Sequence, residues 1–322
     1  MSSGFQTALG GQALESSNFL SLFTIFMIVC TIMYLVVIAA LLLAIARRRR
    51  VDDHLTVETG RHKESTPFAR GAFVGWVGLI GLGLVALTIA SFFTDRSNAS
   101  VAATPQLTIN VTANQWWWDV EYTDHQASNQ FRTANEIHLP VGVPVEITLE
   151  SNDVIHSFWI PNLAGKQDLI PGRVTDIQIL PQKAGTYRGQ CAEFCGVQHA
   201  NMALDVTVES KADFERWVHA QQRPAFAPMT ALQLAGYRYV TTRECSACHN
   251  IGGTPASGQI APDLTHFASR RTIAAGTLPM TTGNLYGWIA DPQSQKPRSK
   301  MPTIGLSPDE VHAVVAYLGT LK

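Results

Sequence analysis

The sequence predicts a multidomain membrane protein built from a two-helix transmembrane hairpin, an all-β domain and an all-α domain. Two long apolar runs predict the hairpin, and a series of short segments with alternating or β-branched residues predicts the β domain. Apolar residues at helical spacing behind a clear start signal predict the last part. The expected parts of the 322 residues are 1–96, 97–209 and 231–322, with a short helix and a linker over 210–230.

The hairpin is expected to span a lipid bilayer over residues 19–46 and 71–94, two runs without a charged residue. Both exceed the roughly 20 residues that a spanning helix needs, and the first lacks the basic segment that opens a signal peptide. No lysine or arginine precedes position 47, whereas arginines at 47–50, Arg61, Lys63 and Arg70 lie between the spans. The positive-inside rule puts this loop in the cytoplasm, so both termini and everything after residue 94 are expected on the extracytoplasmic side.

The β domain is predicted from five segments, 107–112, 116–122, 145–149, 174–180 and 202–208. Glycine and proline at 139–144 and 170–172 supply turns between them. Short strands with regular turns favour a β-sandwich or barrel.

Helical signals follow the β domain. Ser210 with Asp213 three residues later predicts a short helix that ends before Pro224, and residues 221–230 read as a linker. A helix is expected over 232–240. The last helix begins at Ser307, with proline and glutamate in its first turn.

The five cysteines do not predict disulfides, although an oxidising compartment would permit them. Cys30 lies inside the first span, where a small apolar packing role is expected. The other four form two short-spaced pairs, Cys191 with Cys195 and Cys245 with Cys248, each with a histidine close by. This arrangement indicates cofactor sites.

The sequence Cys245-Ser-Ala-Cys248-His249 predicts covalent haem attachment through the two thiols, with His249 as the proximal iron ligand. A thioredoxin-like pair or half of a zinc site would not explain the adjacent histidine. A methionine as sixth ligand would raise the reduction potential. We expect Met301, just ahead of the terminal helix, rather than Met280, for which core filling is the expected role.

The segment 191–202 places Cys191, Cys195, His199 and Met202 within twelve residues, and His156 lies upstream. Thiolate and thioether ligands select copper or iron-sulfur chemistry, and imidazole suits copper and zinc. A mononuclear blue-copper site uses one cysteine, so a second thiolate permits a bridged pair of metals. Electron transfer is the leading interpretation.

These residues resemble subunit II of haem-copper cytochrome c oxidases, through the hairpin and the segments 115–122 (QWWWDVEY), 154–161 (VIHSFWIP), 171–173 (PGR) and 191–202. The resemblance implies a cupredoxin-like Greek-key domain holding a binuclear CuA centre. Cys191 and Cys195 would bridge the two coppers, His156 and His199 would each bind one, and Met202 and the carbonyl of Glu193 would complete the shells. The Glu193 carboxylate resembles a ligand for magnesium at the boundary with the catalytic subunit.

The C-terminal part is similar to a class I cytochrome c, as in the caa(3)-type oxidases. The resemblance implies a subunit of a proton-translocating oxidase in a bacterial inner membrane, with subunits I and III of that family as partners. An external donor, a cytochrome c or a membrane complex, would feed the haem, and the copper centre would pass electrons to the oxygen-reducing site of subunit I. No nucleic acid is expected among the partners.

One departure from the family is that residues 68–93 contain no acidic residue. Many members carry a glutamate there at the mouth of a proton path, and Glu64 is a weak substitute. Among Trp116, Trp117 and Trp118, at least one is expected in the core, and the resemblance implies that another assists electron entry, without indicating which. His138, His219, His266 and His312 are expected to be surface or hydrogen-bonded residues.

Charge differs between the two extracytoplasmic domains. Residues 97–209 hold five Lys and Arg against twelve Asp and Glu, a net charge of −7, and residues 225–322 hold eight against five, a net charge of +3. Such complementarity steers encounters, so transient docking of the haem domain is expected through Lys296, Arg298 and Lys300. A structural or quinol-oxidase-type subunit would lack the copper ligands, all of which are present here. The alternative that stays open is a copper-binding electron-transfer, metal-delivery or sensor protein outside an oxidase. Nitrous oxide reductases share the copper motif but lack the hairpin and the fusion.

Overall fold

The computed structural model describes residues 6–49, 67–102, 104–123, 126 and 129–322, and the backbone alone at a few helix-end positions. The chain divides into two units, residues 18–100 and the remainder. Arg50, Arg61, Lys63 and Glu64, on which the orientation and proton-path expectations draw, lie outside the described residues.

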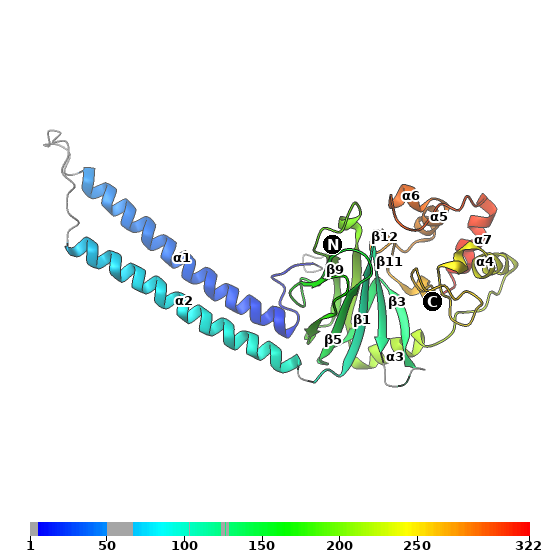
Figure 1. Ribbon diagram of the computed structural model, residues 1–322, viewed down its shortest axis with the longest axis horizontal. Coiled ribbons are helices and arrows are strands. Elements are labelled where there is room, and N and C mark those ends of the chain that lie inside the picture. Colours follow the sequence, from blue (N-terminus) through cyan, green and yellow to red (C-terminus); the bar gives the residue numbers. More distant parts are fainter. Residues whose placement is uncertain (1–5, 50–66, 103, 124–125, 127–128) are drawn as a thin grey trace. The chain divides into compact units, whose positions relative to one another are not determined.

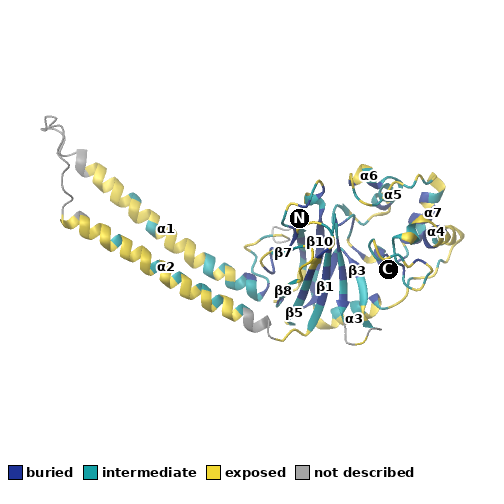
Figure 2. Ribbon diagram, in the orientation of Figure 1, coloured by how far each residue is buried: buried dark blue, intermediate teal, exposed yellow. Residues whose placement is uncertain are grey.

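Two long helices make up the first unit, α1 (Leu14–Arg49) and α2 (Pro67–Ala102). Leucine, isoleucine, valine and phenylalanine cover their surfaces all round, and most of these side chains are exposed (Figure 2). A helix that is apolar on every side belongs in a membrane or a core. Within the described residues both helices are long and apolar enough to cross a bilayer, over 14–46 and 70–98. Each extends beyond the span expected from the sequence.

The β domain, which is also called the copper domain below, is a sandwich of two five-stranded sheets (Figure 1). One sheet has the order β3-β2-β1-β5-β8 and the other β4-β10-β9-β6-β7, and the pairs β1/β5 and β4/β10 are parallel. The strands are β1 (Leu107–Asn114), β2 (Trp117–Thr123), β3 (Phe131–Ala134), β4 (Glu136–Pro140), β5 (Val145–Ser151), β6 (His156–Trp159), β7 (Gln167–Leu169), β8 (Thr175–Ile179), β9 (Gly185–Cys191) and β10 (Ala203–Glu209).

Alternation explains the core of this sandwich. In β1, Ile109, Val111 and Ala113 are buried while their neighbours are half-buried, as a strand with one face inward requires. The same alternation runs through β2 and β5. The inward side chains of both sheets form one apolar cluster, and Cys191, Cys195 and Met202 belong to it. The predicted metal ligands therefore stand at the edge of a rigid core.

Helix α3 (Lys211–Gln221) begins at Ser210, whose hydroxyl accepts the amide hydrogen of Asp213. The helical domain then contains α4 (Ala231–Thr242), η3 (Glu244–Ala247), η4 (Phe267–Ser269), β11 (Thr272–Ile273), β12 (Leu278–Pro279), α5 (Thr282–Ala290), α6 (Pro292–Gln295) and α7 (Pro308–Leu318). Ser307 and Glu310 cap α7 reciprocally, as the sequence predicts.

Close packing of α4 against α7 defines the helical domain. An added Cβ at Gly236 would lie 2.0 Å from the carbonyl oxygen of Ala313, so only glycine permits this approach. Tyr239 and Val240 of α4 pack with Val311 and Val314 of α7 in a second apolar cluster.

Candidate metal and haem centres

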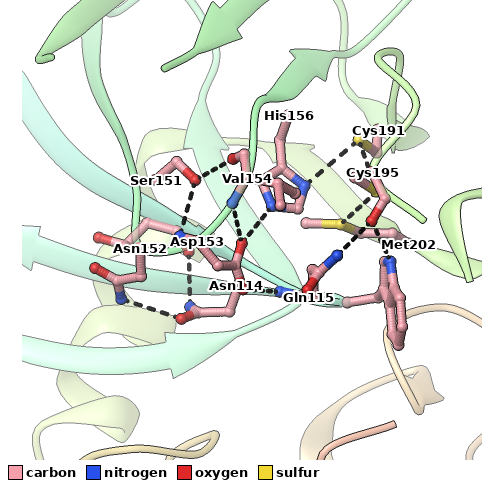
Figure 3. Close-up of polar contacts among 12 residues, drawn as sticks. Asn114, Gln115, Ser151, Asn152, Asp153, Val154, His156, Cys191, Cys195 and Met202 are labelled. Carbon is pink, nitrogen blue, oxygen red and sulfur yellow. Dashed lines mark hydrogen bonds and ion pairs between the residues drawn. The ribbon is translucent and has the colours of Figure 1, made fainter. Parts of the chain in front are cut away.

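Five side chains with soft or imidazole donor atoms gather at one end of the sandwich, and Figure 3 shows His156, Cys191, Cys195 and Met202 among them. His156 begins β6, Cys191 ends β9, His199 lies in η2 (His199–Asn201), and Met202 lies between η2 and β10. The spacings are 3.8 Å from His156 Nδ1 to Cys191 Sγ, 3.7 Å between the two Sγ atoms, 3.6 Å from Cys195 Sγ to His199 Nδ1, and 3.9 Å from Cys195 Sγ to Met202 Sδ. The thiols occupy the middle and the imidazoles the two ends.

The carbonyl oxygen of Glu193 lies 3.2 Å from Cys191 Sγ, on the same side as the donor atoms. Its carboxylate points away and is half exposed, with Oε2 3.9 Å from Lys166 Nζ. Glu193 thus presents its backbone to the thiols and its side chain to the surface. This is the division that the family resemblance implies.

Asp153 contacts the ring nitrogen of His156 that faces away from the thiols. His156 is fully buried, and its Nε2 lies 2.8 Å from Asp153 Oδ1, which leaves Nδ1 facing the thiols. Burial alone would raise the pKa of Asp153, but hydrogen bonds from His156, the backbone of Gln115 and Val154, and Lys300 lower it to about 2. A histidine ligand whose second nitrogen meets a carboxylate is fixed in tautomer and orientation.

The two thiols suit metal binding. Both are buried, and contact with Cys195, together with His156, holds the pKa of the Cys191 thiol well below its usual range. A thiol that ionises readily is a better metal ligand. Sulfur and imidazole donors in this number fit copper better than a hard cation such as magnesium.

The three tryptophans occupy different environments. Trp118 is fully buried and packs edge-on against Phe158, with ring centroids 5.5 Å apart. Trp116 precedes β2, and its indole Nε1 donates to the carbonyl oxygen of Cys195 at 2.8 Å. Gln115 Nε2 donates to the same oxygen at 2.7 Å. Trp117 is half-buried, so Trp118 is the core residue and Trp116 is the one that contacts the metal loop.

The helical domain encloses a cavity of about 560 Å³, within the range of cofactor pockets. Cys245, Cys248 and His249 line it, beside Trp288 and Met301. His249 Nδ1 donates to the carbonyl oxygen of Pro262 at 2.7 Å, which leaves Nε2 free as a ligand. Burial lowers the pKa of His249 and keeps its imidazole neutral. The residues present fit a covalently held haem.

The two methionines considered as sixth ligand lie in different environments. Met301 lines the cavity, and its carbonyl oxygen accepts a hydrogen bond from Gln293 Nε2 at 2.7 Å. Met280 packs against the apolar cluster of the helical domain.

The cavity is shared with the β domain. Trp116, Trp117, Asp119 and Arg132 form part of its wall, although they come from the sandwich. Arg132 forms an ion pair with Asp119 and a hydrogen bond with Gln259 of the helical domain. The haem cavity therefore opens toward the tryptophan that contacts Cys195.

The three cations expected to dock on an acidic surface behave differently from one another. Lys296 is 2% exposed, and its ammonium contacts backbone carbonyls rather than carboxylates. Lys300 forms an ion pair with Asp153 at 3.0 Å, and Arg298 is exposed. Arg270 of the helical domain adds a buried ion pair with Glu136 of the sandwich at 3.5 Å, so the interface combines ion pairs with hydrogen bonds to backbone carbonyls.

Of the four other histidines considered from the sequence, His219 is exposed and three have ordinary partners. His138 Nδ1 lies 2.8 Å from Glu209, both ring nitrogens of His266 face backbone carbonyls, and His312 lies against the ring of Tyr286. Sequence reasoning missed Asp153, Gln115 and Pro262 as supporting residues. Spacing offered one usable signal, since Asp153 stands three residues before His156.

Two family models match the chain. Residues 107–210 match "Cytochrome C oxidase subunit II, periplasmic domain", and residues 234–322 match "Cytochrome c". The two matches cover the sandwich and the helical domain respectively, and each includes the candidate ligands of its own centre.

Curated relatives carry the name cytochrome c oxidase subunit 2. The one from Alkalihalophilus pseudofirmus is 29% identical over 296 residues, covering 92% of this chain and 84% of the relative. The one from Bacillus sp. is 33% identical over 225 residues, covering 66% of this chain. The chain spans 62% of the length of that relative and of the Bacillus subtilis relative, less than two thirds.

Among solved structures, the periplasmic domain of subunit II of cytochrome oxidase of Bradyrhizobium japonicum is 30% identical, with a TM-score of 0.35. The match covers 37% of this chain and 95% of that one. These relatives are subunits of an oxidoreductase complex, and two apolar helices with a periplasmic domain fit a membrane protein with an extracellular domain. The chain belongs to the cytochrome c oxidase subunit II family and carries a C-terminal cytochrome c domain.

Proposed function

We propose that this chain is the electron-entry subunit of a terminal respiratory oxidase. It accepts electrons at a covalently bound haem c and passes them through a binuclear CuA centre to the haem-copper site of subunit I, in a complex that translocates protons. The observation that carries the proposal is the juxtaposition of the two centres. Trp116 lines the haem cavity and donates to the carbonyl oxygen of Cys195.

The copper ligands in this proposal are His156, Cys191, Cys195, His199, Met202 and the carbonyl of Glu193. Two coppers bound there supply a one-electron acceptor and donor. The chain's own contribution is rigidity, because the thiols and Met202 belong to the sandwich core and Asp153 fixes His156. A site held rigidly loses little energy in rearrangement when its charge changes.

The haem ligands in this proposal are His249 and Met301, and Cys245 and Cys248 provide covalent attachment. Trp116 is the electron-entry residue of the three tryptophans. It connects the haem cavity to Cys195 through one indole ring and one hydrogen bond, whereas Trp118 is enclosed in the core.

Further parts of the proposal follow from the family. Glu193 would hold magnesium at the boundary with subunit I, with subunit III as another partner and an external cytochrome c or membrane complex as donor. The two helices would lie in a bacterial inner membrane, with both termini and both redox domains outside. Residues 68–93 supply no carboxylate, so this stretch of the second helix would contribute none to a proton path.

Spectroscopy of the purified complex containing this chain tests the proposal. We expect a purple absorption, a seven-line paramagnetic signal from one unpaired electron shared by two coppers, and a c-type haem spectrum. Copper analysis should give two ions for this chain after subtraction of the copper of subunit I. A mononuclear signal, or zinc in place of copper, would instead support a metal-delivery or sensor protein.

A further inference from the structure

Lys296 is a buried cation that joins the two redox domains. It follows α6, and its ammonium donates to the carbonyl oxygens of Trp116 at 2.9 Å, Asn201 at 2.7 Å and Ala274 at 2.8 Å. An ammonium has three donors, and all three are used. The first two acceptors belong to the copper domain, and the third belongs to the haem domain.

The burial of this charge is compensated at the interface. Burial lowers the pKa of Lys296 to about 7. Three converging carbonyl dipoles stabilise a charge that has left water. These acceptors come together only when the two domains are in contact.

A second contact lies beside the lysine, in residues 272–277, here named the docking turn. Ala275 O accepts the amide hydrogen of Ala203 at 3.0 Å, and Thr272 Oγ1 donates to Asp205 at 2.7 Å. Ala274 and Ala275 both have left-handed backbones, with φ of 53° and 58°. Such values are costly for residues other than glycine, so contacts with the copper domain hold the turn in this shape.

Both contacts lie beside residues that are proposed copper ligands. Asn201 and Ala203 flank the ligand Met202, and Trp116 bonds to Cys195. The lysine and the docking turn therefore fix the haem domain to the segments that carry the copper ligands.

We propose that Lys296 is a positioning residue that, with the docking turn, locks the haem domain onto the copper domain in one orientation. Electrons then pass within a permanent contact rather than after repeated encounters. The electron-transfer consequence rests on the proposed function, whereas the lock itself is a property of the polypeptide and is measurable without either cofactor's activity.

Hydrogen exchange on the full chain in its complex tests the lock. In Lys296→Met, the amide of Ala203 and the peptides over 272–277 should exchange about tenfold faster or more, because their protection depends on domain contact. Amides of β1 and β5 should keep their protection. Arg238→Met removes a matched, exposed positive charge from α4 and should leave all these rates unchanged.

A second variant leaves the lysine in place. A Cβ added at Gly276 would lie 2.9 Å from the Cβ of Ala203, and the backbone φ of +75° at Gly276 disfavours any side chain. Gly276→Ala should therefore expose the same amides. It also guards against the possibility that Lys296→Met fails to assemble.

Electron transfer supplies the functional readout. After rapid reduction of the haem, the haem-to-copper rate in both variants should fall about tenfold, in proportion to the loss of docked population. Exchange and rates equal to wild type in both variants would overturn the lock. Absence of the dicopper signal in the wild type would overturn the proposed function instead, and the exchange result would still stand.

Discussion

The carboxylate of Asp153 supports the proposed copper site, and a single substitution of this residue tests that role directly. One of its oxygens accepts a hydrogen bond from His156, and the other accepts hydrogen bonds from Lys300 and from the backbone N–H of Gln115. The loop between β5 and β6 thus connects a proposed ligand to the haem domain. Sequence patterns identify ligand types by their chemistry, but they do not identify the residues that orient them.

Asp153→Asn should weaken copper binding by about 10–100-fold, because an amide oxygen is a poorer acceptor for the proton on His156 Nε2. Competition with a copper chelator, followed through the paramagnetic signal, measures the loss. Asp168→Asn is the control, since Asp168 is half exposed and lies 3.7 Å from Lys166. Equal copper retention in both variants would remove Asp153 from the support of the site.

Met301→Ala should abolish the weak far-red band of a thioether-iron bond and lower the reduction potential of the haem, since methionine ligation raises it. Met280→Ala should leave the band in place, because Met280 packs in the apolar cluster. Visible spectra of the oxidised complexes decide. Loss of the band in Met280→Ala alone would exchange the two roles.

The tryptophans mark what could not be predicted at this scale. Alternation in a strand explains the burial of Trp118. Trp116 lies outside the strand, and its environment comes from Cys195 and Lys296, which follow it in the sequence by 79 and 180 residues. Local pattern carries no information about such distant partners.

At the scale of elements, strands with clearly alternating or β-branched residues were predictable, and strands without that pattern were not. The expected segments correspond to β1, β2, β5, β8 and β10. The strands β3, β4, β6, β7 and β9 were missed. In β9, the sequence GTYRGQC has low strand propensity, and the strand forms because β10 and β6 pair with it on both sides.

The helix crossing of α4 and α7 gives a prediction for this scale. Gly236→Ala should destabilise the haem domain by about 1–3 kcal/mol, because the new methyl group overlaps the Ala313 carbonyl and forces the helices apart. Denaturant titration followed through the haem absorption measures it. Gly283→Ala in α5 has open space around the new Cβ and should stay within about 1 kcal/mol of wild type.

At the scale of the molecule, sequence patterns correctly predicted two long apolar helices, a β-sandwich and a mainly helical C-terminal domain. Composition also suggested docking by opposite charge. Two ion pairs between the domains, Lys300–Asp153 and Arg270–Glu136, have the expected signs. Hydrogen bonds to backbone carbonyls accompany them, and these depend on the fold of both domains rather than on their net charges. An interface of this kind leaves no pattern in a single sequence.

The haem-to-copper rate should therefore change by less than about twofold between roughly 0.05 and 0.5 M salt, because buried contacts are screened weakly. Flash reduction across a salt series measures it. The exposed Lys300–Asp153 pair is the part of the interface that salt can weaken. A rate that falls steeply and continuously with salt would restore transient docking by charge.

The location of Trp116 determines which molecules can reach it. Trp116 is 9% exposed, belongs to the core cluster of the sandwich and lines the cavity that the haem domain shares. A soluble carrier arriving from outside meets the haem domain and not the indole. If the two centres function as proposed, electrons would enter this subunit at the haem alone, and the fused domain would keep other donors from the copper site.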